Sequence, residues 1–364
     1  MHPMSADFPL HRSPRPVSDA ERAIILSDPG FGRYFTDHMA SAVWTKGEGW
    51  HDQQVGPLQP FSLHPAAAVL HYAQEIFEGL KAYRHEDGSV WLFRPRDNAR
   101  RFQRSARRLA LPQLPEESFL ASVEHLVRAD EPWVPAFGDE KSLYIRPYMF
   151  ASEAFLGVRP ANTVQYAVIA GPAGPYFSSG VTGVTLWVSQ NYTRAAVGGT
   201  GDAKCGGNYA GSLAAQIEAQ EHGCDQVLYL DSQDRDKLEE SGTMNVCLVT
   251  SDGKLVTPAL GTILEGVTRD SVLALAAEHG LTPVERSITI HELRESCGDG
   301  SVTEVFAAGT AAVLTPIVKF LGADLDITVG DGKPGKVTLA IREHILDLQY
   351  GRTKDTRGWL HRVG

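Results

Sequence analysis

The sequence predicts a protein of two domains of the α/β or α+β class. The chain has 364 residues, which is more than one hydrophobic core usually serves. Apolar residues make up 43% and charged residues 21%, as in ordinary folded proteins. Strand-like and helix-like patterns alternate, and a Gly-, Pro- and Ser-rich stretch at 171–180 would sustain neither. We expect a smaller α/β domain at 1–174, a linker at 175–184 and a larger C-terminal domain at 185–364.

The first half contains signals for both strands and helices. Strand-like runs at 70–83 and 90–93 flank an Asp-Gly turn signal, which predicts a hairpin or a meander. Apolar residues then recur at helical spacing, which predicts two amphipathic helices. Aromatic and β-branched residues follow, which predict two strands that complete the sheet. The helices are expected at 98–109 and 116–129, and the strands at 142–150 and 163–171.

The second half begins with a strand at 184–189 and a Gly-rich loop at 198–211. Thr289, with Glu292 in capping-box spacing, opens one helix. Two other helices are expected to end at glycines, and an Asp-Gly pair predicts a hairpin between two strands. These helices are expected at 212–223 and 268–280, and the strands at 226–231, 245–250 and 254–258.

Composition and charge narrow the possible functions. Acidic residues outnumber basic ones, 44 to 34, and no long Lys/Arg run occurs, which argues against nucleic acid. No apolar stretch is long enough to span a membrane. The first 16 residues lack the apolar block of a secretory signal and are expected to form a loose arm. The four cysteines are far apart and form no C-x-x-C pair, so we expect no metal site and a cytoplasmic location.

One lysine has an unusual setting. Lys204 lies within GTGDAKCGGNY, among glycines that permit sharp turns and close backbone approach to a ligand. Most lysines are simply solvated, and the spacing fits neither common nucleotide-binding glycine motif. A lysine that forms a Schiff base needs a partly desolvated site, which keeps its amine neutral often enough to attack an aldehyde. The loop is therefore a candidate for such chemistry.

Pyridoxal phosphate needs a lysine, a phosphate cradle, a donor to its phenolic oxygen and an acid beside its ring nitrogen. Glu240, in LEESGTMN, is the candidate acid, and Tyr209 is the candidate donor. Thr268, at a predicted helix start, and Thr310, in a small-residue turn, could bind phosphate, with Arg101 as counter-charge. Each has a plainer interpretation: a surface acid, a half-buried tyrosine, a helix cap, a turn residue or an arginine on a helix surface.

Several blocks together resemble a known family. FEGLKAY, LFRP-x-x-N, SLYIRP, GGNY, GTMN, EGVTR and GTAAVL-TP, spread from about Phe31 to Gly351, resemble the branched-chain amino acid aminotransferases. The resemblance implies the fold-type IV architecture of pyridoxal-phosphate enzymes, similar to D-amino acid aminotransferase. It also implies reversible, ping-pong transfer of the amino group of L-leucine, L-isoleucine or L-valine to 2-oxoglutarate, giving branched 2-oxo acids and L-glutamate. A homodimer with active sites near its interface is implied as well.

The resemblance assigns a role to each matching position. Lys204 would be the Schiff-base and proton-transfer residue. The cofactor would be bound by Arg101, Lys204, Tyr209, Glu240, Thr243, Gly266, Val267, Thr268 and Thr310. The substrate would be bound by Phe31, Tyr72, Phe77, Tyr144, Arg146, Val158, Tyr176, Thr243, Thr310 and Ala311. A loop near Leu156 and Val158 would reach over from the partner subunit, and Arg146 or Tyr144 would assist binding of the glutamate γ-carboxylate.

Other functions remain open at this point. Another fold-type IV enzyme, either a D-amino acid aminotransferase or an aminodeoxychorismate lyase, is the nearest alternative. A nucleotide-binding enzyme that uses the Gly-rich loop and a non-catalytic protein that retains the scaffold are the others. The redox C-x-x-C of the animal enzymes is replaced by Ala312 and Thr315, so thiol regulation of that kind is not expected. We expect Cys205, next to the lysine, to be a small packing residue.

Overall fold

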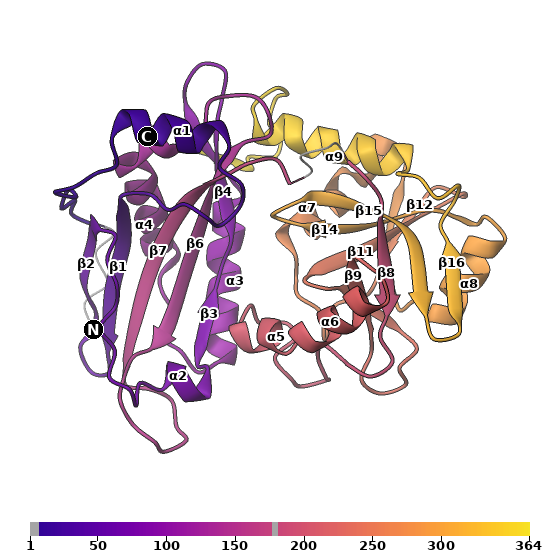
Figure 1. Cartoon of the computed structure of the whole chain (residues 1–364), viewed down its shortest axis with the longest axis horizontal. Coiled ribbons are helices and arrows are strands. Elements are labelled where there is room, and N and C mark those ends of the chain that lie inside the picture. Colours follow the sequence, from indigo (N-terminus) through magenta and orange to yellow (C-terminus); the bar gives the residue numbers. More distant parts are fainter. Residues whose placement is uncertain (1–6, 177–180) are drawn as a thin grey trace. The chain divides into compact units, whose positions relative to one another are not determined.

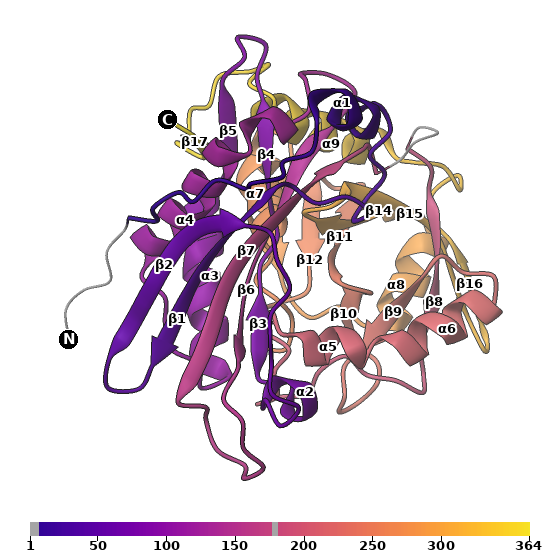
Figure 2. The same ribbon diagram turned by 60° about the vertical axis from the view of Figure 1, so that its left-hand side comes forward.

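The computed structural model describes residues 7–176 and 181–364, which pack as two compact units of mixed helices and strands (Figures 1 and 2). The first unit consists of Met1–Tyr176, Ala203–Gly206 and Asp347–Gly364, and the second of Phe177–Asp202 and Gly207–Leu346. The predicted fold class is confirmed. The predicted linker at 175–184 stays a prediction, because residues 177–180 lie outside the described part of the chain.

The first unit is built on an antiparallel sheet with the strand order β17-β5-β4-β6-β7-β1-β2, and β3 pairs with β6. The strands are β1 (His38–Thr45), β2 (Gly49–Pro57), β3 (Glu75–Phe77), β4 (Leu80–Arg84), β5 (Val90–Phe93), β6 (Ser142–Ala151), β7 (Thr163–Ala173) and β17 (Leu360–Arg362). The helices are α1 (Asp19–Ser27), α2 (Val69–Tyr72), α3 (Pro95–Arg108), α4 (Glu116–Ala129) and the 3-10 turn η1 (Glu131–Trp133). Figures 1 and 2 show α3 and α4 on one face of this sheet.

Local sequence signals account for much of this unit. Both amphipathic helices are confirmed, and α4 buries Phe119, Val123 and Leu126, which recur at helical spacing. The predicted hairpin joins β4 to β5, and Gly88 adopts the positive φ of 84° that its turn requires. The two aromatic-rich segments pair along their whole length as β6 and β7.

The expectation of a loose N-terminal arm is wrong for the described residues. The Phe8 side chain is 2% exposed and belongs to the core of the first unit, where its ring meets His125 of α4. The backbone N–H of His11 donates to the Val55 carbonyl at 2.8 Å. Phe8 is a single apolar residue in a proline-rich segment, and it is buried by packing against residues that are distant in the sequence. The local sequence has no periodic pattern from which this burial could be predicted.

The second unit contains a mixed sheet with the order β10-β9-β8-β15-β14-β11-β12-β13, and β16 pairs with β15. Because β10 also pairs with β11, the strands from β10 to β11 form a closed ring. The strands are β8 (Val184–Val188), β9 (Gln226–Leu230), β10 (Leu238–Ser241), β11 (Met244–Thr250), β12 (Lys254–Thr257), β13 (Thr282–Glu285), β14 (Val302–Gly309), β15 (Val313–Gly322) and β16 (Leu325–Thr328). The helices are α6 (Leu213–Glu221), α7 (Val267–Leu275), the 3-10 turn η2 (Ala276–His279) and α8 (Ile290–Gly298).

Most predicted elements of the second unit are confirmed. Thr289 caps α8, because its hydroxyl accepts a hydrogen bond from the Glu292 amide at 3.0 Å. The segment of α7 and η2 stops at Gly280, whose φ is 72°. The Gly-rich loop is shorter than predicted, because its end forms helix α5 (Gly206–Ala210). Both α5 and α9 (Lys336–Gln349) contain residues of both units.

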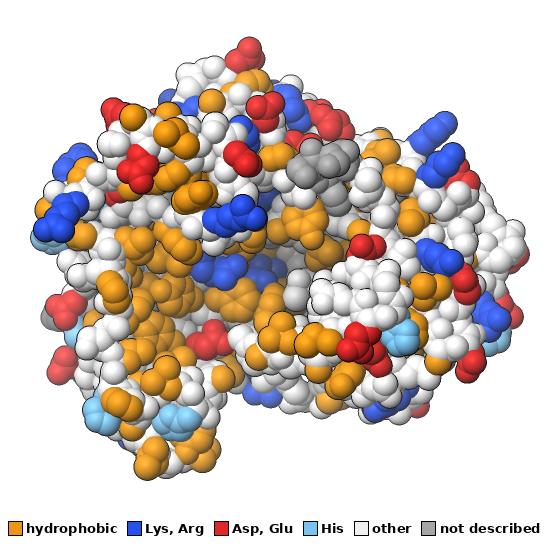
Figure 3. Space-filling view, in the orientation of Figure 1, with side chains coloured by type: hydrophobic (Ala, Val, Ile, Leu, Met, Phe, Trp, Pro, Cys, Tyr) orange, Lys and Arg blue, Asp and Glu red, His pale blue; other side chains and the backbone are white. Residues whose placement is uncertain are grey.

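The surface agrees with the mixed charge of the sequence. On the face drawn in Figure 3, basic and acidic side chains are interspersed among polar and apolar ones. Within residues 7–176 and 181–364, no helix combines the length and apolar character needed to cross a membrane.

Candidate active site

The backbone of Lys204 is anchored within the first unit. The Phe77 N–H donates to the Lys204 carbonyl at 3.0 Å, and the Lys204 N–H donates to the Ser105 hydroxyl at 2.9 Å. The Gly206 N–H donates to the Glu75 carboxylate, and a Cβ at this glycine would overlap that carboxylate. The segment that bears the lysine is therefore tied to β3 and α3, rather than being a free surface loop.

A buried ion pair lies in the same unit. Glu78, between β3 and β4, has no exposed surface, and Arg101 is 3% exposed. The Arg101 Nε and Nη2 donate to the two carboxylate oxygens at 2.7 and 2.8 Å, and the Asn98 amide donates to Oε2 at 2.8 Å. Asn98, Arg101 and Ser105 share the buried face of α3, at i, i+3 and i+7 spacing. This helix thus presents polar groups from the face that would ordinarily be apolar.

These contacts set the charge of Glu78. Burial alone would raise the pKa of this carboxyl. The Arg101 guanidinium and the Asn98 amide outweigh burial, and the pKa is lowered below its usual value. Glu78 is therefore ionised at neutral pH and balances the charge of Arg101.

The Lys204 amine is easier to deprotonate than an ordinary lysine. Its side chain is partly buried, and its Nζ lies 4.8 Å from the centre of the Phe77 ring. Burial first, and the nearby Arg101 charge second, lower its pKa to about 8, although Glu78 acts in the opposite direction. A substantial fraction of this amine is therefore neutral near physiological pH, as an attack on an aldehyde requires.

A cavity of about 300 Å³ in the first unit contains several of the predicted substrate residues. Phe31, Tyr144 and Arg146 line it. The Arg146 Nη2 donates to the Tyr144 hydroxyl at 3.1 Å, and the Phe31 and Tyr144 rings meet edge to face at 5.0 Å. The guanidinium of Arg146 also lies 4.9 Å from the centre of the Phe77 ring. The Lys204 Nζ contacts the same ring. The cavity is thus aromatic, with a single cationic group.

Four predicted substrate residues of the first unit do not line this cavity. One is Phe77, which is next to the cavity only through its contact with the Arg146 guanidinium. Tyr72 lies on α2, and its hydroxyl donates to the Leu156 carbonyl. Val158 is 89% exposed and Tyr176 is 54% exposed. The single chain therefore does not bring Tyr72, Val158 and Tyr176 to the cavity, and their roles stay predictions.

In the second unit, Glu240 is held rigidly on β10. The side chain is 2% exposed. Its Oε1 accepts hydrogen bonds from the Asn245 amide at 3.1 Å and the Leu264 N–H at 2.7 Å, and its Oε2 lies 3.0 Å from the Nε of Arg194. A buried carboxylate with this many donors is suited to remain ionised.

The start of helix α7, a candidate phosphate-binding group, is linked to Glu240 through Asn245. The N-cap residue of α7 is Gly266, which has no side chain of its own to cap the helix, and Thr268 follows in the first turn. A Cβ at Gly266 would overlap the Asn245 amide oxygen, and Asn245 is the partner of Glu240. Glycine at this position therefore lets Asn245 approach the start of α7, and the N-terminus of a helix is the kind of place that suits an anion.

The remaining candidates of the second unit occupy turns and a short helix. Thr310 and Ala311 form the turn from β14 to β15, and β14 pairs with β11 through Ala308 and Asn245. Tyr209 is half-buried on α5, while Thr243 is exposed in the turn from β10 to β11. Within this unit, the structure therefore groups Glu240, Asn245 and the Thr310 turn across adjacent strands.

The donor groups fit pyridoxal phosphate. The first unit holds an amine of lowered pKa with a buried arginine, and the second holds a buried carboxylate and a helix N-terminus without a side-chain cap. These are the groups that the aldehyde, the phosphate and the ring nitrogen of that cofactor require.

Sequence reasoning missed the supporting residues. Glu78 was a possible signal, because it is one of two acids in a strand-like run, and Asn98 falls inside the LFRP-x-x-N block. Ser105 and Arg194 gave no local signal. Cys205 is 3% exposed in the core of the first unit, which confirms its predicted packing role.

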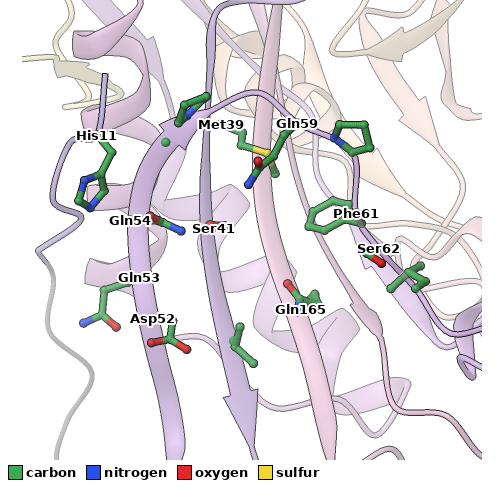
Figure 4. A pocket seen from close by; sticks show the side chains of 15 residues that line it. His11, Met39, Ser41, Asp52, Gln53, Gln54, Gln59, Phe61, Ser62 and Gln165 are labelled. Atoms are coloured by element: carbon green, nitrogen blue, oxygen red, sulfur yellow. The ribbon is translucent and has the colours of Figure 1, made fainter. Parts of the chain in front are cut away.

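A second hollow is not part of this site. It has a volume of about 750 Å³ and lies against β1, β2 and β7, lined by residues such as Gln54, Gln59 and Gln165 (Figure 4). None of the predicted site residues lines it.

The lowered pKa of Lys204 makes a testable prediction. With a pKa of about 8, the neutral and reactive fraction of the amine grows as the pH rises toward 8 and dominates above it, whereas ordinary lysines stay mostly protonated until about pH 10. In cofactor-free protein, the rate of acylation of Lys204 should rise through about pH 8 and then level off. Peptide mass spectrometry after short pulses of reagent measures this, with the exposed Lys254 as reference. A profile for Lys204 that parallels the reference would contradict the prediction.

Comparison with known proteins identifies the family. The family model for amino-transferase class IV matches residues 75–320. A branched-chain-amino-acid aminotransferase of Mycolicibacterium smegmatis is 51% identical over 361 residues, covering 98% of both chains. A probable branched-chain-amino-acid aminotransferase of Streptomyces coelicolor is 53% identical over 353 residues, covering 97% of both.

Comparison with solved structures supports the same family. The branched-chain amino acid aminotransferase of Escherichia coli matches with a TM-score of 0.73 and 29% identity, over 89% of this chain and 100% of that one. The match extends over both units of the fold. The chain therefore belongs to the class IV aminotransferases and, among them, to the branched-chain amino acid aminotransferases.

Proposed function

We propose that the protein uses pyridoxal 5'-phosphate to transfer the amino group of L-leucine, L-isoleucine or L-valine reversibly to 2-oxoglutarate. The branched 2-oxo acid and L-glutamate are the products. The single observation that supports this most strongly is the half-buried Lys204 amine, whose pKa is lowered to about 8 beside a buried arginine. The family membership supports the amino-acid class, and a similar branched-chain enzyme, that of Thermobaculum terrenum, was solved in its PLP-form.

The chain's residues would divide the work as follows. When bound, the cofactor supplies an aldehyde that accepts the amino group and a ring that withdraws electrons from the reacting carbon. Lys204 would bind the aldehyde and then move a proton at the substrate α-carbon. Glu240 would face the ring nitrogen, and Tyr209 would donate to the phenolic oxygen.

The phosphate would be bound by neutral and cationic donors. The N–H groups at the start of α7, at Gly266, Val267 and Thr268, suit an anion. Thr310 would add a hydroxyl, and Arg101 a charge that Glu78 holds in position. Thr243 is exposed in the single chain, so its proposed role rests on the resemblance alone.

The substrate side chain would occupy the aromatic cavity. Phe31 and Tyr144 line this cavity and offer apolar surface that suits branched aliphatic chains and rejects unpaired charge. Phe77 lies next to it, against the Arg146 guanidinium. Arg146, bound to the Tyr144 hydroxyl, is the one cation there and would bind the γ-carboxylate of glutamate. The same cavity could thus accept both partners of the exchange.

A homodimer in the cytoplasm is the proposed assembly. Leu156 and Val158, which are 77% and 89% exposed, form an apolar tip beside Tyr72. A partner subunit that covers this tip would bring Tyr72 and Val158 to a neighbouring site, and this would explain why they do not line the cavity of their own chain. All four cysteines are free, as is usual in a reducing compartment.

The proposal is tested with the cofactor-loaded protein. L-Leucine alone should yield one equivalent of 4-methyl-2-oxopentanoate per site, and turnover should begin only when 2-oxoglutarate is added, as a ping-pong exchange requires. D-Leucine and D-alanine, supplied as controls, should give no product. Turnover with the D-amino acids, or no reaction with L-leucine, would replace this proposal with another fold-type IV activity.

A further inference from the structure

A buried cation contacts the carboxylate that is proposed to face the ring nitrogen. The Arg194 Nε lies 3.0 Å from the Glu240 Oε2, and the two side chains are 6% and 2% exposed. So little exposure keeps solvent and salt from screening the pair. The charge of Arg194 therefore acts on Glu240 more strongly than a surface arginine would.

Arg194 is fixed in this position by other groups. Its Nη2 donates to the carbonyl oxygens of Gly201 at 2.8 Å and Thr262 at 2.9 Å. Its buried Nε makes no hydrogen bond, so its proximity to Glu240 is a contact between charges. The carbonyls orient the guanidinium, and the charge remains available to the carboxylate.

The neighbouring acid, Glu239, is a weak competitor of Glu240 for the ion pair with Arg194. Burial raises the pKa of Glu239 above its usual value, even though the Thr262 hydroxyl donates to it and Arg194 is nearby. The charge of Glu240 raises it further. Glu239 therefore takes up a proton more readily than an ordinary glutamate, and Arg194 is left to stabilise the ionised form of Glu240.

We infer that Arg194 is a positioning residue that keeps Glu240 ionised, so that the proton between Glu240 and the ring nitrogen of the cofactor resides on the nitrogen. This inference rests on the proposed function. An opposite charge this close lowers a carboxyl pKa by about 1–3 units, a factor of about 10–1,000 in proton affinity. Arg194 contacts the carboxylate directly, so it lowers the proton affinity of Glu240 more than that of the ring.

The test uses holoenzyme reconstituted with pyridoxal phosphate that carries ¹⁵N in its ring, because the ¹⁵N chemical shift separates protonated from neutral pyridine nitrogen. In Arg194→Gln, the ratio of protonated to neutral ring should fall at least about tenfold. Arg194→Lys should restore most of the wild-type signal, because charge rather than a directed hydrogen bond is required. Glu239→Gln, the matched control on the same strand, should leave the signal unchanged.

Glu240→Gln separates failure of this inference from failure of the proposed function. If Glu240→Gln changes the ring signal and Arg194→Gln does not, the inference about Arg194 is overturned and the role of Glu240 stands. If neither changes it, the proposed role of Glu240 fails as well. An Arg194→Lys signal that equals that of Arg194→Gln would also overturn the inference.

A double variant covers the case in which Arg194→Gln does not fold. Arg194→Gln combined with Glu240→Gln removes both buried charges and leaves neither unpaired. Because Arg194 acts through Glu240, the double variant should give the same ring signal as Glu240→Gln alone. A signal shifted clearly beyond that of Glu240→Gln would show an independent action of Arg194 and overturn the inference.

Discussion

Lys204→Ala is expected to abolish transamination of L-leucine. The turnover rate should fall by at least about a thousandfold, as is usual when a covalent catalytic group is removed. Without the amine, no group holds the cofactor aldehyde covalently or moves the proton at the α-carbon. The fold should survive, because the Lys204 backbone contacts with Phe77 and Ser105 do not depend on its side chain. Steady-state assays and thermal unfolding of the variant measure the two effects.

Lys254→Ala is the matched control for this prediction. Lys254 lies at the start of β12, and its side chain is 50% exposed beside Asp252. Its removal should change neither activity nor unfolding. Substantial turnover by Lys204→Ala with added cofactor would remove this lysine from the mechanism.

Glu78→Gln is expected to destabilise the protein by about 3–5 kcal/mol, the usual cost of breaking a buried ion pair from one side. The variant leaves the Arg101 guanidinium buried without its counter-charge. The pKa of Glu78 is lowered in the fold, so its stabilisation is present above the unfolded-state pKa and is lost as pH falls through the folded-state pKa. The difference in unfolding free energy between wild type and variant should therefore shrink in acid.

An exposed pair provides the control for Glu78. Glu117 binds Arg96 at 2.7 Å, but both side chains are largely exposed, and such pairs contribute little. Glu117→Gln should leave denaturant unfolding nearly unchanged. Equal unfolding midpoints for Glu78→Gln and the wild type at neutral pH would contradict the account of the buried pair.

Local signals in the sequence were sufficient for many elements. The bounds of α4 match the predicted segment 116–129, since its apolar spacing is regular from end to end. Thr289 caps α8 as its spacing to Glu292 predicts. The hairpin between β11 and β12 follows from Asp-Gly, and Gly253 has the positive φ that such a turn requires. Each of these features is decided by residues a few positions apart.

Features that depend on distant partners could not be predicted in this way. Phe8 is buried only because α4 lies beside it. The sequence assigns Lys204 to the Gly-rich loop of the second domain, but its hydrogen bonds to Phe77 and Ser105 belong to the first unit. No pattern in the sequence around Arg194 predicts its contact with Glu240.

The site residues, too, divide into those that local sequence indicates and those that only distant contacts reveal. Lys204 and Glu240 lie in short blocks whose residue types already indicate the chemistry. Their charged neighbours come from other elements: burial and Arg101 lower the pKa of Lys204, and Arg194 lies against Glu240. Residue type therefore indicated which groups react, and tertiary structure was needed to find what tunes them.

The central claim is that the Lys204 amine bears the cofactor, and chemical trapping tests it most directly. Holoenzyme is reduced with borohydride, digested, and analysed by mass spectrometry for the phosphopyridoxyl adduct. The account predicts one adduct per chain, on the peptide that contains Lys204. An adduct on any other lysine, with Lys204 recovered unmodified, would contradict it.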